Sequence, residues 1–312
     1  MMKRIVVLGG SGFVGRALCR RLAADHPDLR VVVPTRRIVH AAALRPLPMV
    51  EIVQADVHEV AQLQRLLTGA DAVVNLVAIL HGSAADFETA HVELPRRIAT
   101  ACHSAGVSRL VHVSALGVAT DAPSNYLRSK ARGEQVLRDA GLALTVLRPS
   151  VIFGAEDRFL NLFASLQALA PVMPLGGAQA RFQPIWVEDV ARAMVRALEA
   201  GAPPIVECAG PTVYTLAELV RLAGRWAGHE RPIVPLPAGL ARLQATLLEL
   251  APGPTMMSRD NVDSMQVPNV ASGTLPGLDA LGVVPTPMEA VMPAVLAGRG
   301  CRSHLGALRA RR

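Results

Sequence analysis

Residues that build disulfide frameworks and metal sites are scarce in this sequence, and long apolar runs are missing. The four cysteines among 312 residues lie far apart, with no C-x-x-C pair and no Cys/His spacing typical of a metal site. No apolar run approaches the roughly 18–20 residues that span a bilayer, and "MMKR" leads directly into a strand pattern without a signal region. We therefore expect a reduced, metal-free, cytoplasmic protein, at most peripheral to the inner membrane.

Aromatic residues are also rare. They make up 3% of the chain, and although the net charge is +7, the arginines are scattered without a basic block. Nucleic acid is therefore not an expected partner, because stacking rings and a clustered basic face are both lacking. The densest basic stretch, "HLGALRARR" (304–312), could touch an acidic membrane surface or simply fray.

Six short, valine-rich apolar segments alternate with amphipathic ones over the first 150 residues. Strands that are buried on both faces have this composition, and their alternation with helices indicates right-handed βαβ units. We predict an α/β fold with a doubly wound parallel sheet, of the Rossmann type. The predicted strands are 4–9, 29–34, 50–55, 72–78, 109–114 and 144–149, and the predicted helices are 13–24, 59–68, 86–105 and 125–140.

The alternation ends near residue 150. Helical patterns recur at 158–170, 188–200 and 215–228, and the last opens with "TLAE", a capping-box sequence, but proline and glycine become frequent between them. We predict a nucleotide-binding core at 1–150 and a smaller, irregular substrate or partner region at 151–312, partly interleaved with the core.

A glycine-rich loop follows the first predicted strand and opens the first helix. In "VVLGGSGFVGRAL", Gly9, Gly12 and Gly15 form G-x-x-G-x-x-G, with Phe13 and Val14 between the last two. Gly9 permits a tight turn, Gly12 lets the backbone approach a pyrophosphate, and Gly15 lets the helix and strand pack closely. Because the helix N-terminus faces the anion, this loop predicts dinucleotide binding.

The end of the second predicted strand, "VVVPTRR", separates the two nicotinamide dinucleotides. An acidic residue there would bind the ribose 2′-hydroxyl of NAD, whereas arginine accommodates the 2′-phosphate of NADP. This sequence has no carboxylate at that place but has Arg36 and Arg37. We therefore favour NADP(H) over NAD(H), because guanidinium groups bind phosphate bidentately.

The chain has only two lysines and two tyrosines, and one of each, Tyr126 and Lys130, lie four residues apart. Residues at this spacing share one face of a helix. An ammonium beside a phenol would stabilise the phenolate and lower the pKa of the tyrosine. Tyr126 could then exchange a proton with a carbonyl or an alcohol, while Lys130 held the nicotinamide ribose.

The G-x-x-G-x-x-G spacing and the Y-x-x-x-K pair resemble those of the short-chain dehydrogenase/reductase superfamily. The resemblance implies that Asp56, followed by Val57, contacts adenine, although Asp56 could equally be a helix N-cap. It also implies residues that line the cofactor after the fourth and sixth predicted strands, namely Asn75, Val77, Ala78 and Pro149.

The third catalytic member of the superfamily, a serine or threonine after the fifth strand, is altered here. The stretch "HVSALGVAT" places Ser114 on the first serine of the superfamily's "SSxxVYG" pattern and Ala115 on the second, catalytic one. A one-residue offset could bring Ser114 or Thr120 into use, but successive strand residues point to opposite sides. We keep Ser114, Tyr126 and Lys130 as the candidate catalytic residues, and turnover stays an open question.

Three longer stretches, "SNYLRSKARGE", "PSVIFGAEDRFLN" and "FQPIWVEDVA", resemble the extended and atypical branch of the superfamily. Within it they look like the nucleotide-binding accessory subunit of respiratory complex I and its bacterial relatives, over about residues 3–210. That resemblance implies NADPH binding, a link to quinone metabolism and, in the respiratory complex, a structural role. The partners it implies are a small hydrophobic substrate or respiratory-complex subunits.

Two functions compete on these residues. The first is an oxidoreductase or epimerase-type enzyme with Tyr126 as acid/base, whose substrate would be hydrophobic and quinone-related because the C-terminal region is apolar. The second is a largely non-catalytic NADPH-binding accessory or assembly factor of a respiratory complex or of quinone biosynthesis. An NADP(H)-sensing regulator is less favoured, because both Tyr126 and Lys130 are present.

A leucine stripe stands out within residues 239–257. Leu240, Leu243, Leu247 and Leu250 recur at helical spacing and would share one face of a helix. Packing inside the protein is the expected role of this face. A partner surface or a membrane surface is the alternative.

Overall fold

The structure is a computed structural model of the chain, and it describes residues 2–250 and 257–297. Cys301, the basic stretch 304–312 and the end of the leucine-rich segment at 251–256 lie outside the described residues. The chain divides into two compact units, each built from three segments. The first unit comprises residues 1–149, 187–208 and 271–284, and the second comprises residues 150–186, 209–270 and 285–312.

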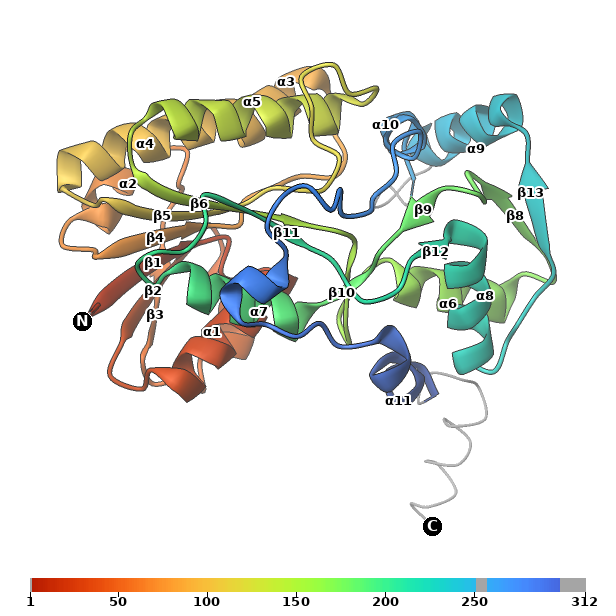
Figure 1. Cartoon of the computed structure of the whole chain (residues 1–312), viewed down its shortest axis with the longest axis horizontal. Coiled ribbons are helices and arrows are strands. Elements are labelled where there is room, and N and C mark those ends of the chain that lie inside the picture. Colours follow the sequence, from red (N-terminus) through yellow and green to blue (C-terminus); the bar gives the residue numbers. More distant parts are fainter. Residues whose placement is uncertain (1, 251–256, 298–312) are drawn as a thin grey trace, which may run out of the picture. The chain divides into compact units, whose positions relative to one another are not determined.

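The first unit is built on a seven-stranded parallel sheet (Figure 1). The strand order is β11-β6-β5-β4-β1-β2-β3, so the direction of winding reverses between β1 and β4. In doubly wound sheets, ligands bind beyond the carboxyl ends of the strands at such a reversal. The strands are β1 (Arg4–Leu8), β2 (Arg30–Thr35), β3 (Val50–Gln54), β4 (Ala72–Asn75), β5 (Arg109–Val113), β6 (Ala143–Pro149) and β11 (Ile205–Cys208).

All six predicted strands and the doubly wound α/β class are confirmed. The central strands are covered on both faces, and the run from Ile5 to Leu8 is fully buried, which explains its unbroken apolar sequence. The seventh strand, β11, was not predicted, because "PIVEC" stands among prolines and glycines and reads as irregular. It is a strand because it pairs in parallel with β6, which buries Val206 beside Leu147.

Helices cover both faces of this sheet (Figure 1). Helices α2, α4 and α5 pack together on one face, and α1 and α7 pack together on the other. The helices predicted at 13–24, 59–68, 125–140 and 188–200 are confirmed, whereas the one predicted at 86–105 is divided by a π-helical segment, Thr89–Glu93. The bounds are α1 (Phe13–Asp25), α2 (Val60–Leu67), α3 (Ala84–Glu88), α4 (Leu94–Ala105), α5 (Asn125–Asp139) and α7 (Val187–Ala197), with short 3₁₀ helices at Ile38–Leu44 and Leu278–Leu281.

The second unit contains three two-stranded sheets and five α-helices among its described residues. The helices predicted at 158–170 and 215–228 are confirmed, and Thr215 and Glu218 form the expected reciprocal capping box. Its strand pairs are β7 (Ile152–Phe153) with β10 (Ile185–Trp186), β9 (Arg181–Phe182) with β12 (Tyr214–Thr215), and β8 (Met173–Gly176) with β13 (Ile233–Leu236). The helices are α6 (Leu160–Leu169), α8 (Leu216–Trp226), α9 (Ala238–Leu250), α10 (Arg259–Ser264) and α11 (Met292–Ala297), with a 3₁₀ turn at Met288–Ala290.

The core of the second unit forms where α6, α8 and α11 meet. Phe153, Leu160, Leu219 and Met292 are each at most 1% exposed within this cluster. The unit therefore has its own hydrophobic core and is not a loose extension of the sheet unit.

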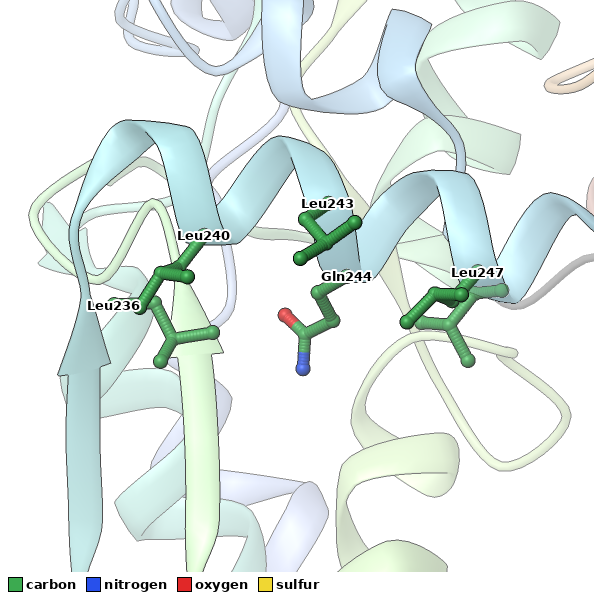
Figure 2. Close-up of a pocket in the computed structure, with 6 residues that line it drawn as sticks. Leu236, Leu240, Leu243, Gln244 and Leu247 are labelled. Atoms are coloured by element: carbon green, nitrogen blue, oxygen red, sulfur yellow. The ribbon is translucent and has the colours of Figure 1, made fainter.

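The leucine stripe on α9 does not pack as expected. Leu240, Leu243, Leu247 and Leu250 are 53%, 54%, 61% and 78% exposed, and three of them project along one side of the helix (Figure 2). Small side chains make the packing contact instead, because Ala241 and Ala245 are buried. The expectation that this face packs inside the protein is therefore wrong within the described residues.

Candidate functional site

The glycine loop between β1 and α1 leaves no room for side chains. Gly9 has φ +81°, and a Cβ there would lie 3.1 Å from the carbonyl carbon of Leu76, which follows β4. A Cβ on Gly12 would lie 3.2 Å from the carbonyl oxygen of Gly9, and one on Gly15 would lie 2.4 Å from the Cα of Gly10. Alanine would therefore clash with the backbone at Gly15, would be strained by the positive φ at Gly9, and would be a tight fit at Gly12.

The first turn of α1 is open to an anion. Its N-cap is Gly12, which is exposed, and no side chain caps the free N–H groups of this turn. The first turn contains no acidic residue, and its half-buried Phe13 and Val14 carry no charge. Uncapped N–H groups and the helix dipole favour a phosphate at this place.

The two arginines predicted to bind a 2′-phosphate lie just beyond the end of β2. Arg36 and Arg37 are both exposed, and the hydroxyl of Thr35 donates a hydrogen bond to the carbonyl of Arg37 at 3.1 Å. The positive charge of Arg36 is one of the causes that lower the pKa of His58, after burial and alongside Arg97. The ends of β2 and β3 are therefore neighbours, as parallel strands require.

Asp56 follows β3 and closes a local turn. Its carboxylate accepts a hydrogen bond from the backbone N–H of His58 at 3.0 Å. Helix α2 has Glu59 as its N-cap, so the alternative that Asp56 caps this helix is wrong. Val57 is half-buried and packs against the core under α2, and the Asp56 side chain stays half-exposed at the strand end.

Asn75 ties the end of β4 to β5. It is fully buried, its oxygen accepts from the N–H of Val77 at 3.1 Å, and its amide nitrogen lies 3.1 Å from Nδ1 of His112. Val77 is half-buried and Ala78 is exposed. Asn75 thus fixes the turn after β4 that approaches Gly9. Val77 and Ala78 belong to this turn and are partly or fully accessible.

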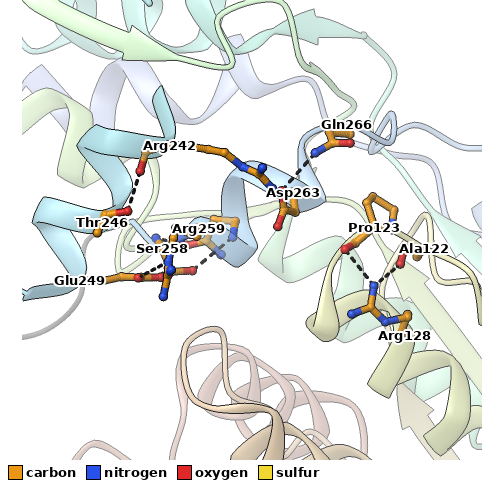
Figure 3. Close-up of polar contacts among 11 residues, drawn as sticks. Ala122, Pro123, Arg128, Arg242, Thr246, Glu249, Ser258, Arg259, Asp263 and Gln266 are labelled. Atoms are coloured by element: carbon orange, nitrogen blue, oxygen red, sulfur yellow. Dashed lines mark hydrogen bonds and ion pairs between the residues drawn. The ribbon is translucent and has the colours of Figure 1, made fainter. Parts of the chain in front are cut away.

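Helix α5 carries the tyrosine–lysine pair. Its start is fixed by Ser124, whose hydroxyl accepts from the N–H of Leu127, and by Arg128, whose guanidinium donates to the carbonyls of Ala122 and Pro123 at 2.6 and 2.8 Å (Figure 3). The first turn of α5, which contains Tyr126, is therefore fixed by both the Ser124 cap and the Arg128 side chain.

Lys130 is 2% exposed, and its ammonium donates to the carbonyl oxygen of Val113, at the end of β5, at 2.7 Å. Burial lowers the pKa of Lys130 to about 8, against the opposing effect of Glu134. Burial raises the pKa of Tyr126 to about 12. The expectation that the lysine lowers the pKa of the tyrosine is thus not met, because loss of hydration dominates both groups.

Ser114 directly follows β5 and the carbonyl that Lys130 contacts. Its backbone N–H donates to the carbonyl of Leu147 at 2.7 Å, while its side chain is buried and its hydroxyl has no hydrogen-bond partner among the described residues. Ala115 is buried beside it. A buried hydroxyl with no partner is unusual, and this one belongs to the residue that directly follows the Val113 carbonyl contacted by Lys130. Pro149, buried at the end of β6, accepts from the N–H of Leu116 at 3.0 Å.

Sequence reasoning missed a buried histidine next to Tyr126. His91 lies on the π-helical segment, its Nε2 accepts from the N–H of Ile79 at 3.1 Å, and its Nδ1 lies 2.8 Å from the hydroxyl of Ser129. Its ring meets that of Tyr126 edge-on, with centroids 5.5 Å apart. Because π-helical bulges have no clear sequence pattern, only the structure could identify it.

The electrostatics of this cluster keep His91 neutral. Burial, followed by the charge of Lys130, lowers its pKa to about 3. The same two causes, with a smaller effect from His91, lower the pKa of His112 well below its usual value. Lys130 is therefore the positive charge of a cluster whose two histidines are neutral at physiological pH.

The described residues contain neither a helix that could span a membrane nor a cluster of metal-binding side chains. No helix within residues 2–250 and 257–297 is long and apolar enough to cross a membrane. In the same part of the chain, no three histidine, cysteine, aspartate or glutamate side chains gather as a metal site would. The glycine loop and the uncapped start of α1 fit the phosphates of a bound dinucleotide.

The fold and this loop define a protein that binds a nicotinamide dinucleotide, and the sequence assigns its family. Residues 5–209 match the NAD dependent epimerase/dehydratase family. The chain belongs to this family, within the extended branch of the short-chain dehydrogenase/reductases.

Known relatives include subunits of a respiratory enzyme and a lipid reductase. The chain is 32% identical to subunit 9 of the mouse mitochondrial NADH dehydrogenase [ubiquinone] 1 alpha subcomplex, over 91% of this chain and 77% of that protein. It is also 32% identical to a ceramide reductase of Caulobacter vibrioides, over 75% and 73%. The resemblance to complex I accessory subunits is thereby confirmed.

Solved structures with the same fold have lower identity. An Escherichia coli NADPH-dependent quinone oxidoreductase, complexed with NADPH, has a TM-score of 0.74 at 22% identity over 96% of this chain and 99% of that one. A Streptomyces venezuelae dTDP-glucose 4,6-dehydratase with bound NAD has a TM-score of 0.71 at 22% identity, over 94% and 95%. These likenesses establish the fold. One of the two solved structures contains bound NADPH and the other contains bound NAD.

Proposed function

We propose that the protein is an NADP(H)-dependent reductase acting on a carbonyl of a hydrophobic substrate, with Tyr126 as the proton donor. The observation that carries the proposal is the buried ammonium of Lys130, which lies 2.7 Å from the Val113 carbonyl, one helical turn after Tyr126. Burying a charge is costly unless the charge is paired and hydrogen-bonded, and burial lowers the pKa of Lys130 although its ammonium donates to this carbonyl. The only internal lysine of an arginine-rich chain therefore points to ligand binding.

The titration of the two side chains favours reduction over oxidation. At neutral pH, Tyr126, with a pKa of about 12, is protonated, and Lys130, with a pKa of about 8, is charged. A protonated phenol can donate to a carbonyl oxygen as negative charge develops there, and the hydroxyl of Ser114 can donate a hydrogen bond to the same oxygen. A bound nicotinamide would supply the hydride.

Arg36 and Arg37 support NADP(H) as the preferred cofactor. Both guanidinium groups are exposed at the end of β2, where no carboxylate stands to repel a 2′-phosphate. NAD(H) remains the alternative, since relatives of this fold bind either dinucleotide.

The proposed substrate is an apolar molecule. The names of two relatives mention ubiquinone and ceramide, which have long apolar chains, and that of a structure with the same fold mentions a quinone. We propose a ketone or quinone of this kind rather than a sugar nucleotide, which would require a more polar second unit.

A second candidate is an NADPH-binding accessory factor, peripheral to the inner membrane in a respiratory complex, with little turnover. Ala115 favours it, because it stands where the superfamily places its catalytic serine. The 32% identity to a respiratory-complex subunit over 91% of the chain also favours it. Under this alternative Lys130 would hold only the cofactor.

Turnover separates these candidates. NADPH oxidation would be followed with a panel of quinones and long-chain ketones, for the wild type and for Tyr126→Phe. We expect a loss of roughly 100-fold or more in kcat, the range of general acid catalysis, with NADPH affinity unchanged. Tyr214→Phe is the matched control, because Tyr214 is the other tyrosine and belongs to the second unit, and it should keep the wild-type rate.

Cofactor choice is tested by calorimetry. Arg36→Glu with Arg37→Glu should weaken NADPH binding at least tenfold and leave NADH binding nearly unchanged, whereas Arg45→Glu, at another exposed arginine, should change neither. Tight NADPH binding with no turnover of any substrate would instead support the accessory factor. Equal rates for wild type and Tyr126→Phe would remove Tyr126 from catalysis.

A further inference from the structure

Helix α9 of the second unit has an exposed apolar face. Leu240, Leu243 and Leu247 line a shallow hollow of about 370 Å³ together with Leu236 and Leu248 (Figure 2). Leu250 continues the same stripe and is 78% exposed. Contiguous apolar surface of this kind marks an interaction site.

The fold does not need this face, because the other sides of α9 already have their contacts. Ala241 is buried, and its Cβ lies where a side chain on Gly176 of β8 would be, 2.6 Å from that position. Arg242 donates to Asp263 at 2.6 Å and Arg259 donates to Glu249 at 2.9 Å, so the polar side is neutralised by α10 (Figure 3). These contacts leave the leucine side of α9 more than half exposed.

The chemistry of the face differs from that of a protein interface. Such interfaces are rich in aromatic residues and contain hydrogen-bonding groups that fix a partner's orientation. Here the hollow is lined by leucines and one polar side chain, Gln244, whose amide already donates to the carbonyl of Pro174 at 3.1 Å. A surface of branched aliphatic side chains without free polar groups can contact fluid lipid chains, which do not require hydrogen bonds to fix their orientation.

The charge of the chain adds a second signal. Residues 298–312 contain five arginines and no carboxylate, and they account for five of the seven excess positive charges of the sequence. They follow α11 in the sequence. An apolar face and a basic segment together are what stable attachment to an acidic lipid surface requires, since a single weak signal gives only marginal binding.

We propose that the leucine face of α9 docks on the surface of a bilayer that contains anionic lipids, which the net positive charge of the chain favours. The leucines enter the boundary between headgroups and acyl chains, and α9 lies along the surface. This interaction is independent of turnover, so its test requires neither substrate nor cofactor.

Vesicle flotation tests the proposal on the full chain. The wild type should float with phosphatidylcholine vesicles that contain phosphatidylglycerol, and binding to pure phosphatidylcholine should be weaker. In Leu243→Ser with Leu247→Ser, the lipid concentration for half-maximal binding should rise about tenfold or more, because both side chains lose their transfer into the apolar phase. Val284→Ser, at a more exposed apolar residue (80%) of the first unit, should bind as the wild type does.

The charge component is tested separately. Changing Arg309, Arg311 and Arg312 to Gln should weaken binding to anionic vesicles and leave binding less sensitive to salt, because fewer charges remain to be screened. Thermal melting of each variant checks that the fold is intact.

Three results would overturn the proposal. One is a wild type that does not float with anionic vesicles. Another is unchanged binding by the leucine variant. The third is a wild type that forms dimers in sedimentation, a monomeric leucine variant and no vesicle binding by either, which would make the face an interface between copies of the chain.

Discussion

The first unit buries polar side chains, whereas the second unit exposes apolar ones. The sheet unit places a lysine and two histidines in its interior, with Lys130 and His91 each only 2% exposed, whereas the second unit leaves four leucines of one helix more than half exposed. Neither arrangement stabilises the unit that contains it. The buried groups of the first unit have hydrogen-bond partners within the chain, whereas in our proposal the exposed leucines of the second unit contact a lipid surface.

The units also differ in how closely their helices pack near these features. In the sheet unit, α5 meets the π-helical segment backbone to backbone, because a Cβ on Gly133 would lie 1.9 Å from the carbonyl oxygen of His91. On α9 of the second unit, a Cβ on Gly239 would meet nothing within 4 Å. Glycine is thus required by packing at one position and is unconstrained at the other.

The largest expected effect is that of Gly133→Ala. A methyl group cannot fit between α5 and the His91 carbonyl, so the helix must move, and we expect a loss of about 3 kcal/mol or more in the free energy of unfolding. Urea denaturation measures it. Gly239→Ala is the control, and it should be neutral or slightly stabilising because alanine is the better helix former. Equal effects of the two changes would contradict the close packing described for the sheet unit.

A smaller effect is expected from acid. The pKa of His91 is about 3 in the folded protein against the ordinary 6.5. Between these values the unfolded chain binds a proton that the folded chain does not, so stability is present above pH 6.5 and falls as the pH is lowered. The loss between pH 6.5 and 5 should be about 2 kcal/mol.

The slope of unfolding free energy against pH measures this contribution, and His91→Gln should flatten it. His112 has its pKa shifted in the same direction, so part of the slope should remain in the variant. A slope that is the same in both proteins would show that His91 is protonated or accessible in the native state.

The smallest effect is expected on the exposed face of the second unit. Leu247→Ala should change the free energy of unfolding by less than about 0.5 kcal/mol, because the side chain is 61% exposed. Leu219→Ala, at a fully buried leucine of α8, should destabilise by about 2–5 kcal/mol. Thermal or urea unfolding of both variants compares them directly, and a large loss at Leu247 would mean that the leucine face packs inside the protein after all.

The sheet and the position of the nucleotide loop could be predicted because they follow from local patterns. Buried parallel strands such as Ile5–Leu8 need an unbroken apolar sequence, and a tight turn such as that at Gly9 needs glycine. Strand β11 could not be predicted in the same way, because only its pairing with β6 makes "IVEC" a strand.

The electrostatics of the site were less predictable than its residues. The spacing of Tyr126 and Lys130 placed them on one helix face, but it could not show that the lysine binds the carbonyl of Val113 or that burial raises the pKa of the tyrosine. His91 depends on a π-helical segment and on a contact from α5, and neither leaves a trace in the local sequence. The exposure of the α9 leucines is likewise a tertiary property, because helical spacing identifies a face but not what covers it.

The contact between Gly133 and the carbonyl of His91 has a mechanical consequence for the site. A shift of α5 along its axis would bring the side chain of Arg132 or Glu134 against the π-helical segment, so the helix has a single allowed register. Glu134, fully buried and bound to Arg148 of β6 at 2.5 Å, opposes the same movement from the sheet side. Tyr126 and Lys130 therefore lie on a helix whose position is fixed by packing against the π-helical segment and by an ion pair to the sheet.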